Sequence, residues 1–323
     1  MKATVRARAN IALIKYWGKA HAALNVPAVG SVSLTLDALW TETAVEFDET
    51  LSGDSLVLNG GGRSDQLQRV TACLDLLRDR AGVATPARVV SRNNFPTGAG
   101  LASSASGFAA LAAAGARALE LELSPRALSI IARQGSGSAA RSLFGGFVEM
   151  HAGCRPDGSD SYAEPLLTAD AWPLEVVVAI TERGEKPVGS RAGMERCAAT
   201  SPYYPQWVGG SAADVRCARE AILGRDFGRL AEVAEHSCLK MHATALAARP
   251  PLIYWNAATL GCVEAVRELR GSGVAVFFTI DAGPQLKAVC APGAGRDVER
   301  ALRALPGVLD TLVSGLGPGV EAM

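Results

Sequence analysis

Residues 96–121 read PTGAGLASSASGFAALAAAGARALEL, a turn of small residues that runs directly into an alanine-rich helix. The backbone of such a turn can approach a ligand closely, and the first N–H groups of the helix have no partner within the helix. Because the helix dipole also favours negative charge there, the segment predicts a phosphate-binding loop. The serine hydroxyls can donate to phosphate oxygens or serve as a ligand of magnesium.

The same residues are also compatible with a plain turn before a tightly packed core helix, because short glycine motifs recur in many proteins. No Gly-Lys-Ser or Gly-Lys-Thr follows, and the G-x-G-x-x-G spacing is absent. The segment is therefore neither a Walker loop nor a dinucleotide fingerprint. It indicates a phosphate loop of a third kind.

Length and composition limit the class of protein. The chain has 323 residues, enough for one large or two ordinary domains, and 49% of them are hydrophobic, so a sizeable core can form. The 32 basic and 32 acidic residues cancel. A general nucleic-acid-binding protein usually shows a basic excess, so no nucleic-acid partner is expected, although a local basic pocket remains possible.

Cysteines and apolar runs indicate the compartment. The seven cysteines form no C-x-x-C pair and their number is odd, which favours free thiols in a reducing cytosol. No apolar run reaches the ~18 residues of a membrane span, and residues 1–19 do not read as a signal peptide. We expect a soluble, cytoplasmic protein without a membrane partner.

Strands are predicted where β-branched residues alternate or cluster, and helices where apolar residues recur at helical spacing. The predicted strands cover residues 4–16, 31–47, 56–58, 88–91, 174–180, 273–280 and 311–313. The predicted helices cover residues 65–80, 124–134, 211–223, 226–247, 257–270 and 298–305. This mixture predicts an α+β or α/β fold, and the strand at 174–180 either ends a first domain or begins a second.

Two clusters near the first predicted strands combine cations, hydroxyls and glycines. In the stretch NIALIKYWGK, residues 10–19, Lys15 and Lys19 are point cations suited to a phosphate or a carboxylate. In GSGSAARS, residues 135–142, Arg141 can bind a carboxylate or phosphate with two parallel hydrogen bonds. Taken alone, each cluster is equally compatible with a solvated strand end or a Gly-Ser surface loop.

Two later features resemble these clusters in their chemistry. KPVGSRAGM, residues 186–194, repeats the serine-plus-arginine pattern on a predicted loop, and it is also compatible with an ordinary charged loop. Asp281 follows the apolar strand at 273–280, where it forms either a simple turn or a general base. None of the four histidines has metal-ligand spacing, so each is interpreted as solvated or packed. Together these parts suit phosphoryl transfer from a nucleotide to a small polyanion.

The motifs resemble those of a known superfamily. PTGAGLASSASG is similar to the ATP-binding loop of the GHMP kinases, P-x-x-x-G-L-G-S-S-A, with Ala102 at the second glycine. The stretches NIALIKYWGK, GSGSAARSLFGGFVE, KPVGSRAGM, KMHATALAARPPLIYW and FFTIDAGP resemble, within that superfamily, the diphosphomevalonate decarboxylase family. They follow the family's order over about residues 5–285.

The resemblance implies an α+β, two-domain GHMP kinase fold. Residues 1–180 would form the ATP-binding domain and residues 181–323 a ferredoxin-like domain, with the active site in the cleft between them. The implied cofactors are ATP and Mg²⁺, the implied partner molecule is mevalonate 5-diphosphate, and homodimers are common in the family. The implied enzyme phosphorylates the tertiary 3-hydroxyl and then releases phosphate and carbon dioxide, which gives isopentenyl diphosphate for isoprenoid biosynthesis.

The resemblance also assigns roles to residues. Asp281 would be the catalytic base or orienting group, with Lys15 beside it, and Arg141 and Asn10 would hold the substrate carboxylate. The implied substrate- and diphosphate-binding residues are Tyr16, Lys19, Arg69, Ser136, Ser138, Ser190 and Arg191. The implied ATP-binding residues are Asn93, Asn94, Gly98, Gly100, Leu101, Ala102, Ser103 and Ser104. No acidic magnesium ligand is evident, so the metal ligands stay unassigned.

Departures from the family pattern are small, and three alternatives stay open. Gly98, Ala140 and Gly189 replace the usual alanine, cysteine and serine, and none of these changes removes a charge. A mevalonate 3-kinase or a catalytically inactive binding module of the same fold is disfavoured by the retained Lys15 and Asp281. A phosphomevalonate decarboxylase differs only in the diphosphate pocket, which sequence resolves weakly.

Overall fold

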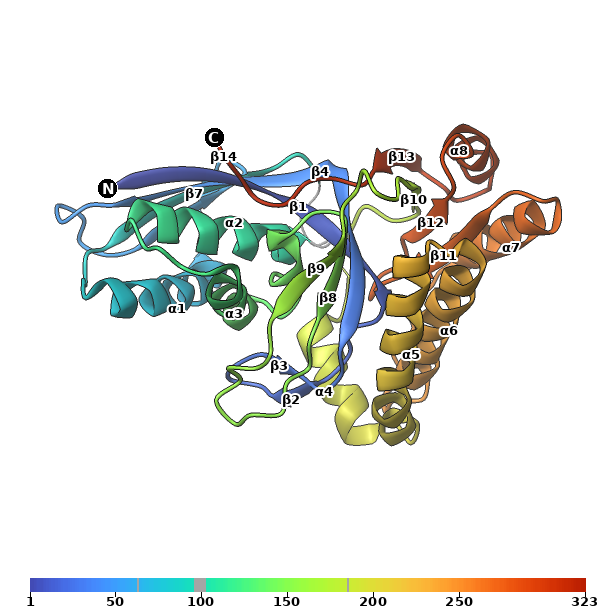
Figure 1. Ribbon diagram of the computed structural model, residues 1–323, viewed down its shortest axis with the longest axis horizontal. Helices are drawn as coiled ribbons and strands as arrows, with labels where there is room; N and C mark the ends of the chain where they lie inside the picture. Colours follow the sequence, from blue (N-terminus) through green and yellow to red (C-terminus); the bar gives the residue numbers. More distant parts are fainter. Residues whose placement is uncertain (63, 96–102, 185) are drawn as a thin grey trace.

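A computed structural model describes residues 1–62, 64–95, 103–184 and 186–323. Two large β-sheets lie side by side along an elongated molecule, with helices packed on one face of each, and β2 (Lys19–His21) and β3 (Val26–Pro27) form a small third sheet (Figure 1). The predicted α+β class is confirmed. The predicted residues Gly98, Gly100, Leu101 and Ala102 lie outside the described residues.

The first sheet is built on two long antiparallel strands, β1 (Lys2–Ile14) and β4 (Ser31–Phe47). Its remaining strands are β5 (Ser55–Leu58), β6 (Gly61–Gly62), β7 (Ala87–Asn93), β8 (Phe147–Met150), β9 (Ala163–Leu167) and β14 (Glu321–Ala322). Residues 38–47 of β4 alternate between partly exposed and buried positions, as expected for a sheet with one covered face. Residues 31–36 are all buried, so this half of the strand is covered on both faces.

Three helices cover one face of the first sheet: α1 (Ser64–Ala81), α2 (Ser103–Ala118) and α3 (Pro125–Gly135). The small side chains of α2 allow it to lie directly against β1 and β4. Gly115 permits the contact between α1 and α2, because a Cβ there would lie 2.6 Å from Leu77. Ser124 caps α3 by accepting a hydrogen bond from the N–H of Ala127 at 3.2 Å, which confirms the predicted helix start.

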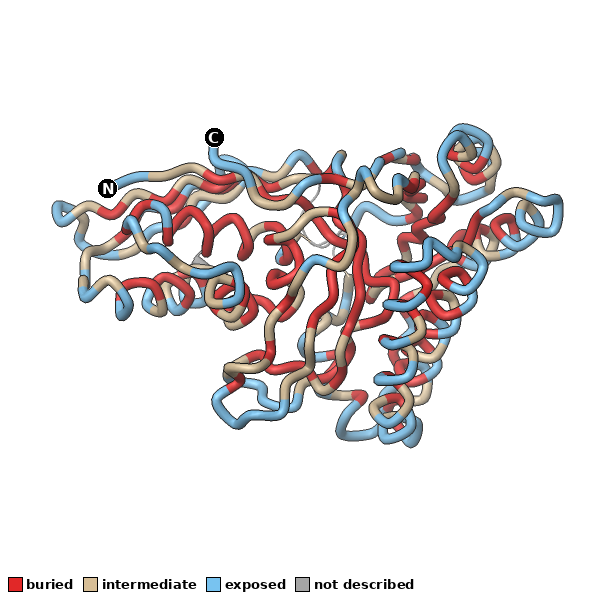
Figure 2. The backbone as a smooth tube through the Cα atoms, viewed as in Figure 1, coloured by how far each residue is buried: buried red, intermediate tan, exposed pale blue. Residues whose placement is uncertain are grey.

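The second sheet has the order β11 (Val276–Ile280), β12 (Leu286–Cys290), β10 (Glu175–Ile180) and β13 (Asp310–Gly315), all antiparallel. One face packs on α7 (Ala257–Gly271) and α8 (Gly295–Arg303). The other face shares a core with the doubly buried halves of β1 and β4, which is the continuous buried region in Figure 2. The two sheets are therefore held together by one hydrophobic core.

Two long helices, α5 (Tyr204–Gly224) and α6 (Phe227–Leu246), pack against each other beside both sheets. Helix α6 contacts β1 of the first sheet and β11 of the second. The short elements β2 (Lys19–His21), β3 (Val26–Pro27), η1 (Arg141–Leu143) and α4 (Ser190–Thr200) complete the region around the site. Within the described residues, no helix is both long and apolar enough to cross a membrane.

The structure corrects several predicted elements. Residues 190–194, predicted as part of a loop, begin α4, because Gly189 in extended conformation provides the N-cap. Strands β8, β9 and β12 are additional to the prediction. The division into domains near residue 180 stays a prediction. Since β10 hydrogen-bonds within the second sheet, a division just ahead of residue 175 fits the sheets better.

Candidate active site

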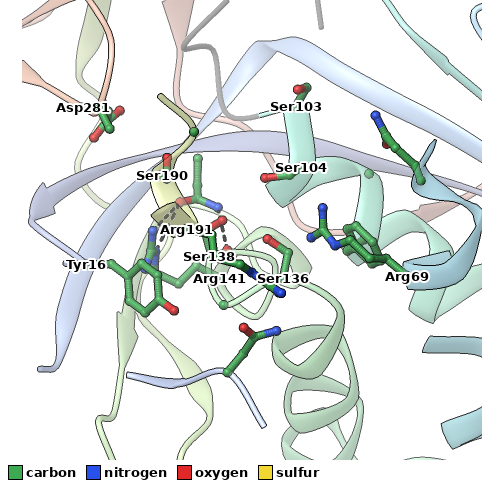
Figure 3. Close-up of a pocket in the computed structure, with 18 of the residues that line it drawn as sticks. Tyr16, Arg69, Ser103, Ser104, Ser136, Ser138, Arg141, Ser190, Arg191 and Asp281 are labelled. Atoms are coloured by element: carbon green, nitrogen blue, oxygen red, sulfur yellow. Dashed lines mark hydrogen bonds between the residues drawn. The ribbon is translucent and has the colours of Figure 1, made fainter. Parts of the chain in front are cut away.

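A cavity of about 640 Å³ lies where the helices of the first sheet, helix α4 and the end of β11 meet (Figure 3). Most of the predicted site residues that the structure describes are on its wall, although they are up to 271 positions apart in the sequence (10 to 281). They are Asn10, Lys15, Tyr16, Lys19, Arg69, Asn93, Ser103, Ser104, Ser136, Ser138, Arg141, Ser190, Arg191 and Asp281.

One end of the cavity holds a buried ion pair. Lys15 follows β1 and Asp281 follows β11, so each sheet supplies one partner. The Lys15 Nζ donates to Asp281 Oδ1 at 2.7 Å and to the carbonyl oxygen of Ala12 at 2.8 Å. Lys15 is 1% exposed, whereas the side chain of Asp281 is 26% exposed. The carboxylate is therefore fixed on one side and open to the cavity on the other.

A second lysine, which the sequence analysis did not assign to the site, completes this group. Lys287 is 1% exposed on β12, and its Nζ lies 3.4 Å from Asp281 Oδ2. Burial alone would raise the pKa of Asp281, but the charges of Lys15 and Lys287 lower it by more, so the pKa lies well below its ordinary value. Asp281 is thus a firmly anionic carboxylate. Its place depends on the hairpin register, which pairs Lys287 with Thr279 and which the sequence analysis did not predict.

Beside this ion pair, Arg141 and Asn10 form a second fixed unit. The Nε and Nη2 of Arg141 donate to Asn10 Oδ1 at 3.2 and 3.0 Å, and its Nη1 donates to Ser31 Oγ at 2.7 Å. Asn10 Nδ2 in turn donates to Ser142 Oγ at 2.7 Å. Burial lowers the pKa of Arg141 to about 10, so the guanidinium stays charged near neutral pH. A buried cation of fixed orientation suits a carboxylate ligand.

Tyr16 presents a buried hydroxyl at the same end of the cavity. In the part of the chain that the structure describes, its Oη has no hydrogen-bond partner. Gly137 makes room for it, because a Cβ at that position would lie 2.2 Å from the Oη atom. Burial raises the pKa of Tyr16 to about 12, so the group remains a phenol. A buried donor on a cavity wall is available to an anionic ligand.

Two further cations on the cavity wall come from β2 and from the segment just before α4, where Lys186 also donates to the carbonyl of Ala282 at 2.8 Å, next to Asp281. Lys19 Nζ donates to Asn25 Oδ1 at 2.7 Å, and burial together with the charge of Arg191 lowers the pKa of Lys19 to about 8. Lys186 Nζ donates to Ser190 Oγ at 2.8 Å, and burial lowers the pKa of Lys186 to about 8. Asn25 and Lys186 were not among the predicted site residues, and both line the cavity.

The opposite end of the cavity consists of the start of α2 and an apolar wall. Ser103 and Ser104 are the first residues of α2, and Ser104 is exposed. Arg69 lies between the two ends: its guanidinium is 4.7 Å from the Phe108 ring and donates to the carbonyl of Gly135 at 3.0 Å, and its charge acts on Lys19 and Arg191. The apolar part of this wall consists of Leu56, Leu58, Val70, Val89, Phe108 and Leu111.

Asn94, which was predicted to bind ATP, has a structural role in this fold. Asn94 does not line the cavity. Its Oδ1 accepts from the N–H of Trp40 at 2.8 Å, and its Nδ2 donates to the carbonyl of Ala38 at 2.8 Å. The neighbouring Asn93 does line the cavity, and its Oδ1 accepts from Thr41 at 2.7 Å. Asn94 therefore holds the turn after β7 against β4.

The two large sheets with their helices form a GHMP-type fold. Its cavity has a helix that begins with serines at one end and an anionic carboxylate between lysines at the other, which suits a phosphate donor that meets a small acceptor. Two family models match the chain. The diphosphomevalonate decarboxylase-like N-terminal domain covers residues 7–163, and the mevalonate 5-diphosphate decarboxylase C-terminal domain covers residues 176–302. The chain belongs to the diphosphomevalonate decarboxylase family.

Individual relatives agree with this assignment. The chain is 42% identical over 303 residues to a diphosphomevalonate decarboxylase of Gibberella zeae, which covers 88% of this chain and 79% of the relative. Mevalonate diphosphate decarboxylase of Staphylococcus aureus matches with a TM-score of 0.93 and 39% identity, over 100% of this chain and 98% of that one. A structure described as MDDEF in complex with MVAPP, AMPPCP and magnesium has a TM-score of 0.92 and 41% identity, over 100% and 99%.

Proposed function

We propose that this protein is an ATP-dependent decarboxylase that converts mevalonate 5-diphosphate into isopentenyl diphosphate in the mevalonate pathway. The observation that carries the proposal is the Asp281 carboxylate, which is held by Lys15 at 2.7 Å and is open to the cavity. The start of α2 lies on the wall of the same cavity, so a phosphate donor and an acceptor hydroxyl can meet within it.

Asp281 orients the 3-hydroxyl of the substrate by accepting its hydrogen bond. Two ammonium groups keep the pKa of Asp281 well below its ordinary value, which makes it a weak base for a neutral alcohol. The proton therefore passes to the Asp281 carboxylate only late, as the oxygen bonds to phosphorus and becomes more acidic. Between the roles of base and orienting group, the charges around Asp281 favour the orienting role.

Arg141 holds the substrate carboxylate next to this hydroxyl, and Asn10 fixes the guanidinium by accepting two of its hydrogen bonds. The amide nitrogen of Asn10 already donates to Ser138 and Ser142. Three of the five N–H groups of Arg141 bond to Asn10 and Ser31, which leaves two for a ligand. Phosphorylation turns the tertiary hydroxyl into a good leaving group. When phosphate departs, positive charge develops at the tertiary carbon and draws the carboxylate electrons into the new double bond, with release of carbon dioxide.

The 5-diphosphate fits the cationic end beside Tyr16. Lys19 and Arg191 lie on this wall, and the Tyr16 hydroxyl adds an available donor. Lys186 lies between Ser190 and Ala282, on the side of Asp281. This density of donors suits two phosphoryl groups better than one. It favours the diphosphate over the monophosphate of a phosphomevalonate decarboxylase.

Magnesium and ATP fit the other end. No three His, Cys, Asp or Glu side chains among the described residues gather into a metal site. The hydroxyls of Ser103 and Ser104 are oxygen ligands of the kind that Mg²⁺ accepts, alongside phosphate oxygens and water. When bound, the metal would neutralise charge on the transferred phosphoryl group.

We also propose that the protein is cytoplasmic and forms a homodimer. All seven cysteines are free, which suits a reducing compartment. Light scattering of the purified protein tests the dimer. A mass near twice the 33.5 kDa of one chain is expected, and a mass of a single chain would overturn this part of the proposal.

Product analysis tests the function. Purified protein is incubated with ATP, magnesium and one of three substrates: mevalonate, its 5-phosphate or its 5-diphosphate. We expect carbon dioxide and isopentenyl diphosphate from the diphosphate alone. Isopentenyl phosphate from the monophosphate, or a stable 3-phosphate without carbon dioxide, would assign the protein to a sister activity.

A further inference from the structure

Strand β11, which carries Asp281 at its end, is an edge strand. It pairs only with β12 in the four-stranded sheet that the structure describes, so the N–H and C=O groups on its outer side need other partners. Helix α6 lies along that outer side. The side chains of Glu235, Cys238 and His242 therefore take the place of a neighbouring strand.

These three residues are spaced i, i+3 and i+7 along α6, which puts them on one face of the helix. Glu235 Oε1 accepts from the N–H of Phe278 at 3.1 Å, and Cys238 Sγ accepts from the N–H of Ile280 at 3.2 Å. His242 Nε2 lies 3.1 Å from the carbonyl oxygen of Ile280. Both backbone polar groups of Ile280 are thus bound by α6.

The contact made by His242 acts directly on the next residue. The carbonyl of Ile280 and the N–H of Asp281 belong to one planar peptide unit, so fixing the carbonyl oxygen fixes the plane from which Asp281 continues. Beyond it, Asp281 enters a tight turn in which its own carbonyl accepts from the N–H of Gly283 at 2.8 Å. The backbone from which the Asp281 side chain departs is therefore fixed from the α6 side.

The state of the histidine ring follows from its surroundings. His242 is 2% exposed, and its ring lies 4.7 Å from the ring of Trp255. Burial lowers the pKa of His242 to about 3, so the ring is neutral. A carbonyl oxygen can only accept, so the single ring proton must be on Nε2, where it is donated to Ile280.

Helix α6 also holds Lys15, the ion-pair partner of Asp281. The backbone N–H of Lys15 donates to Ser237 Oγ at 3.0 Å, one residue before Cys238. Helix α6 thus fixes the backbone on both sides of the ion pair. We propose that His242 is a positioning residue, whose Nε2–H holds the Ile280–Asp281 peptide so that the carboxylate meets Lys15 and faces the acceptor hydroxyl. This proposal rests on the function proposed above.

Three variants test the proposal. In His242→Gln, the amide nitrogen can reach the position of Nε2 and keep the hydrogen bond, whereas His242→Leu fills a similar volume without a donor. Thr244→Val is the matched control, because it removes a different buried hydrogen bond of α6, from Thr244 Oγ1 to the carbonyl of Lys240 at 3.0 Å.

The kinetic readout separates positioning from a loss of stability. For His242→Leu we expect kcat to fall about 10- to 100-fold, with both KM values within about twofold of wild type. His242→Gln should recover most of the activity, and Thr244→Val should keep kcat. An unchanged kcat in the leucine variant, or a glutamine variant as impaired as the leucine variant, would overturn the proposal.

Two further measurements test the proposal without the kinetics of His242→Leu. If His242→Leu does not fold, Cys238→Ala removes the other side-chain contact to Ile280, and normal kcat in that variant would count against the proposal. A crystal structure of a folded variant tests positioning without any assay. The Lys15–Asp281 distance should exceed the 2.7 Å of the native chain, and an unchanged distance contradicts the inference. Wild-type protein that is inactive on mevalonate 5-diphosphate would instead count against the proposed function.

Discussion

At the acceptor end of the cavity, charged side chains are bonded to one another within the protein, whereas the nucleotide end offers a helix start and an apolar wall. The contact of Arg141 with Asn10 is buried, that of Asp281 with Lys15 is partly buried, and both are made without a ligand. Ser104, by contrast, is exposed. Preorganised charge of this kind acts on the rate of the chemical step. We therefore expect acceptor-end changes to lower kcat and nucleotide-end changes to raise the KM for ATP.

The largest effect is expected from Asp281→Asn. The amide has no charge, so it leaves Lys15 and Lys287 buried without their anion and weakens the orientation of the hydroxyl. We expect kcat to fall by about 10³-fold or more, while an ATP analogue binds nearly as well as to wild type. Asp157→Asn, on the exposed loop before β9, serves as the control. Near-normal turnover of the Asp281 variant would sink the role assigned to it.

An effect of intermediate size, on kcat/KM for the diphosphate substrate, is expected from a rise in pH. The pKa of Lys19 and that of Lys186 are both lowered to about 8, so each lysine loses its positive charge as the pH rises through 8. The fit of the diphosphate weakens in that direction, and kcat/KM for this substrate should fall about tenfold between pH 7 and pH 9 for each titrating group.

Replacement of both lysines by arginine, which stays charged over this range, should flatten this part of the profile. The KM for ATP provides the internal control, since it should change little over the same pH range. A profile that keeps its full alkaline decline in the double variant would assign the titration to other groups.

The smallest effect is expected from Ser104→Ala at the start of α2. Loss of one exposed hydroxyl removes about 1 kcal/mol of interaction with phosphate, which corresponds to about a fivefold rise in the KM for ATP. The value of kcat should stay within about twofold of wild type. Ser138→Ala, at the acceptor end, is the matched comparison and should leave the KM for ATP unchanged. If both variants raise it equally, the two ends are not separate in function.

Local signals in the sequence predicted much of the fold. Alternating β-branched residues placed a strand at 31–47, the bounds that β4 has, and Ser124 with Pro125 placed the start of α3. Strand β12 was missed because it is short and contains a lysine whose burial depends on Asp281. Residues 190–194 of α4 were interpreted as part of a loop because Gly193 and the polar residues around it give little apolar periodicity.

The site was predictable only in part for a similar reason. Residues within recognisable motifs, such as Lys15, Arg141 and Asp281, could be named from the sequence, and the structure brings them to one cavity. His242 acts through Ile280, which is far away in the chain, and Lys287 acts on Asp281 across a hairpin. Their environment depends on strand register and on the packing of α6, which no local pattern expresses.

Strand β1 places two members of the site on one continuous piece of backbone, with Asn10 inside the strand and Lys15 immediately after it. A register irregularity between Ala12 and Ile14 lets these two side chains, five residues apart, line the same cavity. One inserted or deleted residue between them would turn the later side chain away from it. Among descendants of this gene, the five-residue spacing should therefore resist length change, while the exposed loop at 154–157 is free to grow or shrink. A segment without insertions or deletions would thus indicate the position of the active site even where substitutions have changed the residues around it.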